Sequence, residues 1–362
     1  MRSYLFLSFH KPSPGAEREL WQIGLARLLQ ERGEVPFIMS NNEVLLKLAR
    51  ASGLATRHVG WPIKFGVFAW LSWWWWILQF RWGKLVSETG HFRNRSEERP
   101  LVVCWSRLDQ WLATLPARVL GMRVLWGMAE QPRRFRVMSR LTSPFAPSRA
   151  LAHETFSKLK RPTAVVTPLV DMEGVRLQPW RFRETVSEWT IAVVNDLNRP
   201  WQTSLVLQAL PELLEHIPMA RVVVIGVGIE RQHLQWLAKT LGVAERVSWV
   251  TPLPDGTPWF PRCQAVVVSR IDEPAFSFAV ARAQLAGIPV VASSHGVHQE
   301  YITVEETGGL FTSSDAESLT QALVQIANRP ERSLQMAARA RAEAIKRHAE
   351  ERVWQQWRRL IT

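Results

Sequence analysis

A buried strand that ends in a polar loop and is followed by a helix and a second buried strand is the feature that most constrains the fold of this chain. Residues 265–268 form an apolar run that stops at Ser269, and an acidic loop with Glu273 follows. A helical pattern of small residues runs to Gly287, and residues 288–292 form the second apolar run. Strands that alternate with helices predict a parallel sheet, in which ligands bind at the carboxyl ends of strands.

Other apolar runs of strand length extend this pattern over the chain. They occur at residues 1–9, 101–104, 222–228 and 247–250. With 362 residues, of which 47% are hydrophobic, the chain can form two domains of ordinary size, each with its own core. The sequence therefore predicts an α/β protein with two parallel sheets.

The segment from Ser269 onward resembles the sugar-donor site of GT-B glycosyltransferases of the retaining family 4 type. Members of this family have a serine after a strand, a Glu-Pro pair, a Gly-x-Pro-Val-Val-Ala-Ser run and a glycine loop that ends in glutamate. The matching positions here are Ser269, Glu273-Pro274, Gly287–Ser293, Gly296, Glu300 and Thr307–Gly309. Near the amino terminus, residues 14–18 (PGAER) resemble the glycine loop that precedes the first helix of the family.

The resemblance implies an α/β fold of the GT-B type, with two Rossmann-like domains whose parallel sheets face a central cleft. We expect an acceptor-side domain over residues 1–175, which includes a tryptophan-rich amphipathic helix at 65–82. The donor-binding domain is expected over residues 186–340, and a helix over 341–362 is expected to cross back to the first domain.

The resemblance also implies roles for individual residues. Glu273 would be the catalytic residue and support the sugar. The expected donor-binding residues are Arg199, Gly226, Gly228, Trp249, Arg282, Gly296 and Glu300. The expected acceptor-side residues are Gly15, Glu17 and Glu130. Two histidines of the donor loop, His295 and His298, are more often incidental in such a position than ligands.

The donor site departs from the family pattern at three positions. Asp196 stands where the family usually has arginine, and Trp201 stands where it usually has lysine, so that Arg199 is the local positive charge. Arg282 stands where the second glutamate of the family usually accepts hydrogen bonds from ribose, and a guanidinium cannot accept them. Arg282 could instead contact phosphate in place of the missing lysine.

No metal or other cofactor is expected. The sequence contains no Asp-x-Asp motif and no cluster of histidine and cysteine. The leaving diphosphate would be stabilised by basic side chains and helix amino termini. The two cysteines, Cys104 and Cys263, offer no disulfide framework and are expected to be buried thiols in a reducing compartment.

The charge of the chain is concentrated in its first half. The net charge is +13, and residues 1–180 contain 26 basic and 13 acidic side chains, whereas residues 181–362 contain 19 of each. A basic surface attracts membranes or nucleic acids. The arginines at 133–136 are not accompanied by a nucleic-acid motif, which favours a solvated or phosphate-facing surface over a nucleic-acid partner.

Residues 65–80 (FGVFAWLSWWWWILQF) form an uncharged, tryptophan-rich segment between Lys64 and Arg81. The segment is shorter than the roughly 20 residues of a membrane span, and tryptophan prefers the headgroup boundary. A helix that lies on an anionic membrane surface is the favoured interpretation, with a protein interface and an intramolecular core as alternatives. Because residues 1–9 lack the pattern of a secretory signal, the expected location is the cytoplasmic face of the membrane.

The sequence thus predicts a glycosyltransferase that moves a sugar from a nucleotide-sugar donor to a membrane-associated, lipid-linked or glycan acceptor. Retention of configuration follows from the resemblance alone. A non-catalytic GT-B module that acts in membrane docking or assembly is the main alternative, because the donor motif is degenerate at Asp196, Trp201 and Arg282. Phosphorolysis and inverting transfer remain further options on this fold.

Overall fold

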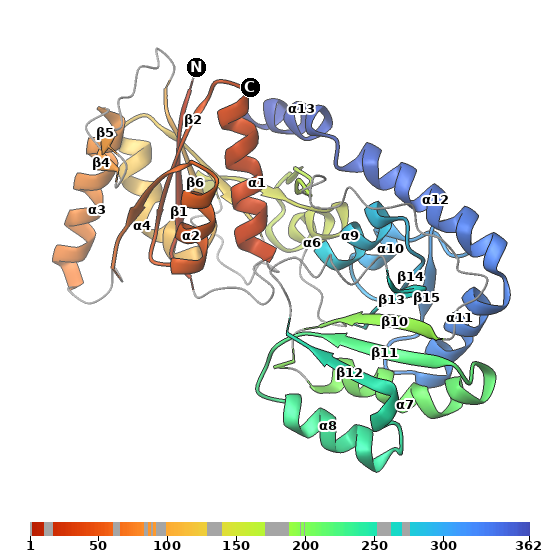
Figure 1. Cartoon of the computed structure of the whole chain (residues 1–362). Helices are drawn as coiled ribbons and strands as arrows, with labels where there is room; N and C mark the ends of the chain where they lie inside the picture. Colours follow the sequence, from red (N-terminus) through yellow and green to blue (C-terminus); the bar gives the residue numbers. More distant parts are fainter. Residues whose placement is uncertain are drawn as a thin grey trace. The chain divides into compact units, whose positions relative to one another are not determined.

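The computed structural model of the chain contains two compact units, each built around one parallel sheet (Figure 1). The first unit comprises residues 1–169 and 350–362, and the second comprises residues 170–349. The structure describes residues 2–10, 17–60, 66–82, 86–87, 90–91, 99–128, 140–170, 188–195, 197–198, 200–251, 262–269 and 276–362.

The first unit has a seven-stranded sheet in the order β3-β2-β1-β6-β7-β8-β9, and every neighbouring pair is parallel. Its strands are β1 (Ser3–Ser8), β2 (Val35–Ser40), β3 (Ala55–His58), β6 (Leu101–Cys104), β7 (Arg123–Gly127), β8 (Ser143–Ala146) and β9 (Ala164–Val165). A separate antiparallel pair consists of β4 (Val86–Ser87) and β5 (Gly90–His91). The order of the strands reverses between β1 and β6, which is where sheets of this kind bind ligands.

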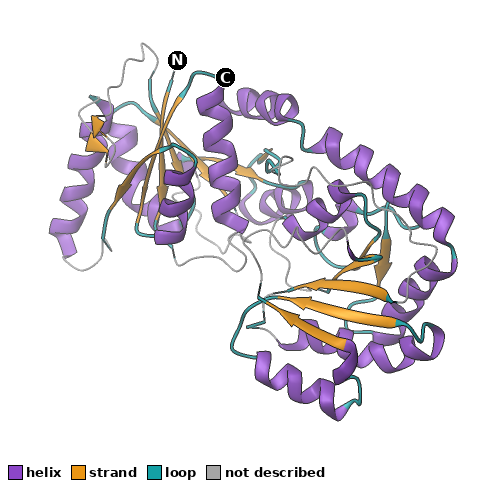
Figure 2. Ribbon diagram, in the orientation of Figure 1, coloured by secondary structure: helices purple, strands orange, loops and turns teal. Residues whose placement is uncertain are grey.

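Helices cover both faces of this sheet (Figure 2). They are α1 (Glu17–Glu31), α2 (Glu43–Ala51), α3 (Gly66–Arg81), α4 (Arg107–Val119), α6 (Arg149–Leu159) and α13 (Glu350–Ile361). Helices α3 and α4 pack against each other, and their buried side chains Ile77, Phe80 and Leu112 share one apolar core with strand residues such as Leu5 and Phe37. The two helices therefore form one layer on the same face of the sheet.

The second unit has a six-stranded parallel sheet in the order β12-β11-β10-β13-β14-β15. Its strands are β10 (Trp189–Val194), β11 (Ala220–Ile225), β12 (Val247–Val250), β13 (Ala265–Val268), β14 (Val290–Ser293) and β15 (Gly309–Phe311). Its helices are α7 (Pro200–His216), α8 (Arg231–Thr240), α9 (Phe278–Ala286), α10 (His298–Tyr301), α11 (Ala316–Asn328) and α12 (Pro330–Arg347), with a 3-10 turn at Ala244–Arg246. Numbered within the unit, this order is 3-2-1-4-5-6, the order of the Rossmann fold.

The predicted α/β architecture with two parallel-sheet units is therefore confirmed. The last part of the chain differs in detail from the single helix expected over 341–362. Helix α12 extends through that boundary and belongs to the second unit, and the separate helix α13 belongs to the first.

Helix α13 is held to the first unit by a buried tryptophan and by polar contacts. Trp357 is fully buried and packs against Tyr4 and Phe145, with ring centroids 5.9 Å and 5.6 Å away. Arg123 donates hydrogen bonds to the carbonyl oxygens of Ile361 (2.7 Å) and Leu360 (3.1 Å). These contacts fix the carboxyl-terminal helix against strands β1, β7 and β8.

Helix α3 has a buried and an exposed side. Ile77 and Phe80 are fully buried, whereas Trp75 and Trp82 are exposed. Trp76 is half-buried and lies under the guanidinium of Arg57, whose Cζ atom is 3.9 Å from the ring centroid. Part of the tryptophan-rich segment thus contributes to the core of the first unit, and part of it faces outward. Within the described part of the chain, no helix combines the length and the hydropathy needed to cross a membrane.

Candidate functional site

The point at which the strand order of the second sheet reverses, between β10 and β13, contains three small polar side chains in contact. Asn195 follows β10, Ser269 follows β13, and Thr203 lies in the first turns of α7. The Nδ2 atom of Asn195 donates hydrogen bonds to Ser269 Oγ at 3.0 Å and to Thr203 Oγ1 at 3.2 Å. All three side chains are buried, so this cluster fixes the start of α7 and the ends of both central strands.

The two glycines predicted for the nucleotide turn, Gly226 and Gly228, lie directly against the loop that follows β10. A Cβ atom on Gly226 would lie 2.2 Å from the carbonyl oxygen of Asn195, and one on Gly228 would lie 2.1 Å from the carbonyl carbon of Leu197. Two backbone hydrogen bonds, Leu197 N to Val227 O (3.2 Å) and Asn195 N to Ile225 O (3.2 Å), join the same segments. Glycine is therefore required here because two backbones approach each other closely.

The loop after β14 contains a left-handed turn and a buried histidine. Gly296 has a φ of 57°, a conformation that glycine adopts without strain, and it is exposed. His298 is fully buried, and its Nδ1 atom lies 3.0 Å from the carbonyl oxygen and 3.2 Å from the Oγ of Ser293. His295 is exposed and Glu300 is half-buried on α10. His298 therefore has a structural role in fixing this loop at the carboxyl end of β14.

Helix α9 carries Arg282 at the position where the second glutamate of the family pattern was expected. The helix is capped by Ser277, whose Oγ accepts a hydrogen bond from Val280 N at 3.4 Å. The guanidinium of Arg282 lies over the ring of Phe278 on the same helix, with its Cζ atom 5.6 Å from the ring centroid. Arg282 is half-buried on this helix surface.

Trp249 lies on the edge strand β12, and its partly buried side chain packs against the core of the second unit. Its carbonyl oxygen accepts a hydrogen bond from Arg231 Nη2 at 3.1 Å, and Arg231 Nη1 lies 3.5 Å from Thr251 Oγ1. Arg231 is not among the site residues predicted from the sequence. Its position in the first turn of a helix, shortly after a Gly-x-Gly turn, could have indicated it.

Several predicted site residues lie outside the described residues. They are Gly15, Glu130, Arg199 and Glu273, together with Asp196 and the side chains of Glu17 and Trp201. The structure places Gly226 and Gly228, which the sequence predicted for the donor site, against the loop that contains Asn195, and Asn195 contacts Ser269. Asn195 and Thr203 were not selected from the sequence, although a polar residue at the end of a buried strand was a usable signal.

The first unit has its own polar network where the strand order reverses between β1 and β6. The buried carboxylate of Asp109 accepts hydrogen bonds from the backbone nitrogens of Phe9 (2.8 Å), Trp105 (3.0 Å) and Ser106 (2.7 Å). Burial raises the pKa of Asp109, while hydrogen bonds from Ser106 and from the backbone and the nearby His10 act in the opposite direction. Asp109 thus holds the ends of both central strands of this sheet.

A buried histidine and glutamate extend this network along α1. His10 Nδ1 lies 3.7 Å from Glu19 Oε1, and His10 Nε2 lies 2.6 Å from Ser8 Oγ. Glu19 Oε1 also accepts a hydrogen bond from Asn42 Nδ2 at 2.7 Å. These polar side chains contact one another at the carboxyl ends of β1 and β2. The network therefore holds the loops at this edge of the first sheet in place.

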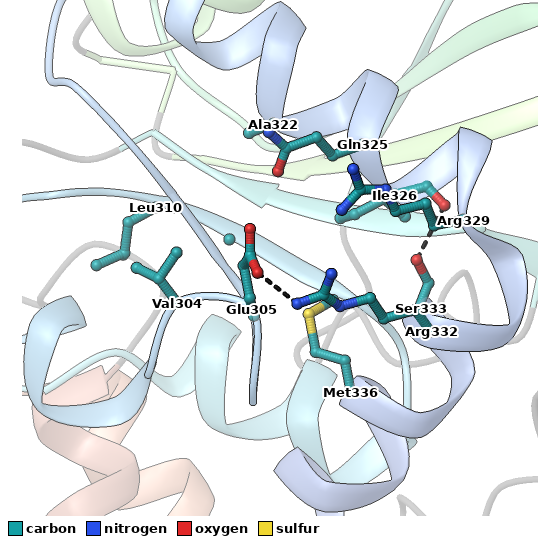
Figure 3. Close-up of a pocket in the computed structure, with 12 residues that line it drawn as sticks. Val304, Glu305, Leu310, Ala322, Gln325, Ile326, Arg329, Arg332, Ser333 and Met336 are labelled. Atoms are coloured by element: carbon teal, nitrogen blue, oxygen red, sulfur yellow. Dashed lines mark hydrogen bonds and ion pairs between the residues drawn. The ribbon is translucent and has the colours of Figure 1, made fainter.

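A pocket of about 60 Å³ lies elsewhere in the second unit, between β15, α11 and α12 (Figure 3). Glu305 and Arg332 form an ion pair at its mouth, and Ser333 Oγ donates a hydrogen bond to the carbonyl oxygen of Ile326 at 2.9 Å. Gly309 lines the pocket and is the first residue of β15, so the pocket is at the amino end of that strand. It therefore does not belong to the cluster around Asn195.

Among the described residues, no group of three or more histidine, cysteine, aspartate or glutamate side chains is arranged to hold a metal ion. The two cysteines are buried, as expected. Burial raises the pKa of Cys104 well above its usual range and that of Cys263 to about 12.

Comparison with known proteins finds a family match within the second unit. Residues 189–329 match the family of glycosyl transferases group 1. A GDP-mannose-dependent α-(1-6)-phosphatidylinositol monomannoside mannosyltransferase from Mycolicibacterium smegmatis is 27% identical over 221 residues, which are 57% of this chain and 55% of that protein. The chain thus spans about half the length of this curated relative.

Solved structures match the fold over the whole chain. A glycosyltransferase from Rickettsia africae superimposes with a TM-score of 0.82 at 15% identity, covering 100% of this chain and 99% of that one. The Anabaena protein Alr3699/HepE, crystallised with UDP and glucose, superimposes with a TM-score of 0.80 at 16% identity and the same coverage. The chain therefore has the GT-B fold, and residues 189–329 of its second unit match the glycosyl transferases group 1 family.

Proposed function

We propose that the chain transfers a sugar from a nucleotide-sugar donor to a glycan or lipid-linked acceptor. The observation that carries this proposal is the match of residues 189–329 to the group 1 family. The matched segment contains all six strands of the second sheet and the described loops at their carboxyl ends. In parallel sheets these loops hold the ligand.

The donor is proposed to be a nucleoside diphosphate sugar. The Mycolicibacterium relative is named for GDP-mannose, and the Anabaena protein was crystallised with UDP and glucose. Both names contain a nucleoside diphosphate. In this chain, the turn at Gly296 and the first turn of α7 are backbone segments whose N–H groups could donate hydrogen bonds to such a diphosphate. Asn195 supports the proposal because it holds the start of α7 in place.

The side chains expected from the sequence complete the proposed donor site. Glu273 and Glu300 would accept hydrogen bonds from the sugar hydroxyls. Arg199 and Arg282 would offset the charge of the diphosphate, and Trp249 would lie beside the base. On the acceptor side, Gly15, Glu17 and Glu130 would contact the second substrate.

The proposed reaction is a retaining transfer that needs no metal ion. The bond between the anomeric carbon and the diphosphate oxygen breaks, and the acceptor hydroxyl oxygen forms the new bond to the same carbon on the same face. The leaving diphosphate takes the proton of the acceptor hydroxyl. Positive side chains and backbone N–H groups stabilise the charge that develops on the diphosphate.

The acceptor is proposed to be held at the cytoplasmic face of an anionic membrane. Two exposed tryptophans, Trp75 on α3 and Trp82 directly after it, support this location, as does the excess of basic residues in the first half of the chain. The Mycolicibacterium relative is named for a phosphatidylinositol monomannoside acceptor. A nucleic-acid partner is not proposed.

A non-catalytic GT-B module is the second candidate. Asp196, Trp201 and Arg282 replace charged residues of the family pattern. In addition, the guanidinium of Arg282 lies over Phe278 on its own helix. Such a module would keep the fold and the membrane contact without transferring a sugar.

A thermal-shift titration with UDP, GDP, ADP and their common sugar conjugates tests the first candidate. A ligand present at about 100 times its Kd stabilises the folded state by about 2.7 kcal/mol, which is readily measured as a rise in Tm. A selective shift identifies the base, and release of the nucleotide from its sugar conjugate in the presence of membrane extract then tests turnover. Absence of any shift in folded protein would favour the non-catalytic module.

A matched pair of variants locates the binding site. Glu300→Gln changes a half-buried carboxylate on α10, the helix after β14, and should reduce the ligand-induced shift. Glu306→Gln removes an exposed carboxylate that pairs with Arg339 at 3.0 Å and should leave the shift unchanged. An equal effect of both variants would argue against the proposed donor site.

A further inference from the structure

Helix α4 exposes an apolar stripe on the side that faces away from the core. Trp111, Leu115 and Val119 are spaced four residues apart and are 48%, 44% and 64% exposed. Residues with this spacing lie on one face of a helix. The opposite side, with Leu112 and Ala117, is buried in the core of the first unit. Helix α4 is thus apolar on two sides, which is unusual for a helix whose outer face meets only water.

Two arginines flank this stripe. Arg107 and Arg118 are exposed on α4, on the same sector of the helix as Trp111. Arg118 Nε donates a hydrogen bond to the carbonyl oxygen of Leu141 at 2.8 Å, and Leu141 is itself exposed. The one acidic residue of α4, Asp109, is buried on the other side of the helix. We call the set of Arg107, Trp111, Leu115, Arg118, Val119 and Leu141 the α4 stripe.

The neighbouring helix α3 adds exposed tryptophans to the same layer. Helices α3 and α4 pack side by side on one face of the first sheet (Figure 1). Trp75 of α3 and Trp82, which directly follows the helix, are 57% and 62% exposed. The backbone nitrogen of Trp82 still donates a hydrogen bond to the carbonyl oxygen of Leu78, so the spacing of seven residues places both side chains on the same side. Helix α3 contains no acidic residue. Apolar and positively charged side chains are therefore the main exposed groups described on this pair of helices.

The composition of this surface fits a lipid bilayer better than a second copy of the chain. An isologous dimer would place the same patch on both partners, and Arg107 and Arg118 would then face like charges. In a bilayer surface, tryptophan lies at the headgroup boundary, leucine and valine enter the acyl region, and arginine reaches the phosphates. Anionic lipids attract such arginines further.

We propose that the α4 stripe, together with Trp75 of α3 and Trp82 directly after it, is a two-helix surface that docks on an anionic lipid bilayer. The proposal deepens the proposed function, on which it rests only for the location of the acceptor. It extends the membrane contact from the tryptophan-rich segment to the exposed face of α4. It also assigns Arg107 and Arg118 to the lipid phosphates. The docking itself requires no sugar transfer.

Co-sedimentation with vesicles tests the proposal. The purified full chain is mixed with vesicles of phosphatidylcholine alone or of equal parts phosphatidylcholine and phosphatidylglycerol. The wild type should sediment with the mixed vesicles and much less with phosphatidylcholine alone. Leu115→Gln combined with Val119→Gln removes apolar surface without adding charge, and binding should fall at least about tenfold. Arg107→Gln combined with Arg118→Gln should lower binding to the mixed vesicles by about thirtyfold, and binding to phosphatidylcholine should change little.

Two controls distinguish the docking proposal from non-specific vesicle binding and from the proposed sugar transfer. Trp236→Gln replaces an exposed tryptophan of α8 in the second unit and should bind vesicles as the wild type does. The nucleotide thermal shift of both α4 double variants should equal that of the wild type, because their substitutions lie in the first unit. If the nucleotide shift is absent throughout but vesicle binding follows the pattern above, the proposed function fails and the docking surface stands.

Three results would overturn the docking proposal. The first is unchanged vesicle binding by the Leu115→Gln, Val119→Gln variant in protein whose Tm equals that of the wild type. The second is equal binding of the wild type to both kinds of vesicle. The third is a lipid-free dimer that becomes monomeric in that variant by sedimentation equilibrium, which would assign the stripe to a second copy of the chain.

Discussion

Asn195 and Ser269 are 74 residues apart in the sequence, and the Nδ2 atom of Asn195 donates a hydrogen bond to Ser269 Oγ at 3.0 Å. The bond joins the ends of the two central strands, β10 and β13, at the point where the strand order of the second sheet reverses. A second bond from the same atom reaches Thr203 in α7. One side chain thus sets the relative positions of two loops and one helix at the candidate donor site.

Replacement of Asn195 by alanine should therefore affect both stability and ligand binding. Loss of the two buried hydrogen bonds is expected to lower the free energy of unfolding by about 1–3 kcal/mol. The nucleotide-induced rise in Tm should be reduced as well, because the start of α7 is no longer fixed. Urea unfolding and thermal-shift titration measure the two effects.

Asn198→Ala is the matched control for that variant. Asn198 is an exposed asparagine of the same loop, and its Oδ1 accepts a hydrogen bond from Ile229 N at 3.2 Å. We expect its effect on stability to be under about 1 kcal/mol. Equal losses in the two variants would contradict a special role of Asn195.

Gly228→Ala should be strongly destabilising. Its Cβ atom would lie 2.1 Å from the carbonyl carbon of Leu197 and 2.4 Å from Asn198 N, so two loop backbones would have to separate. We expect a loss of about 3 kcal/mol or more in chemical unfolding.

Gly60→Ala provides the comparison, because no atom of the described residues lies within 4 Å of the added Cβ atom and the backbone needs no left-handed conformation. That substitution should be neutral or stabilise the protein by up to about 1 kcal/mol. A neutral Gly228→Ala variant would show that the contact between the two loops is not required for folding.

Trp357→Ala should release α13 from the first unit. The indole is fully buried between Tyr4 and Phe145, and truncation of such a side chain costs about 3–5 kcal/mol. Removal of residues 354–362 should have at least the same effect on Tm. Trp354→Ala is the control: Trp354 is half-buried under Arg32, so the expected loss is about 1 kcal/mol. An unchanged melting temperature in the truncated protein would contradict the role assigned to this helix.

The two thiols should be unreactive in the folded protein. Burial raises the pKa of Cys263 from 9.0 to about 12 and that of Cys104 well above its usual value, so neither forms a thiolate near neutral pH. A chromogenic disulfide reagent should label neither cysteine in native protein between pH 7 and about 9, and both after unfolding. Rapid labelling of the native protein would show that one of the thiols is accessible.

The same pKa values predict the sign of a pH effect on stability. The unfolded chain loses its thiol protons near pH 9, whereas the folded protein keeps them to higher pH. Because the folded state then binds more protons, the free energy of unfolding should fall as the pH rises from about 9 toward 12. Cys263→Ala should weaken this slope in urea unfolding measured over that range.

The amino-acid sequence by itself determined the elements of the fold. The strands read from apolar runs at 101–104, 247–250 and 265–268 are β6, β12 and β13 of the structure, and the tryptophan-rich segment is helix α3. Local patterns can specify these elements because the spacing of apolar residues differs between a buried strand and a helix with one buried face. The alternation of strands and helices then permitted the two parallel sheets.

Tertiary structure decided which distant residues meet. No local pattern pairs Asn195 with Ser269, or places Trp357 on Tyr4, because the partners are far apart in the sequence and burial alone does not identify a neighbour. In the same way, the sequence of α4 does not indicate which of its apolar residues are exposed. Only the packed structure shows that Leu112 is buried and Leu115 is exposed. Sequence periodicity specifies that a face is apolar, and the packing of the whole chain decides whether that face meets the core or remains exposed.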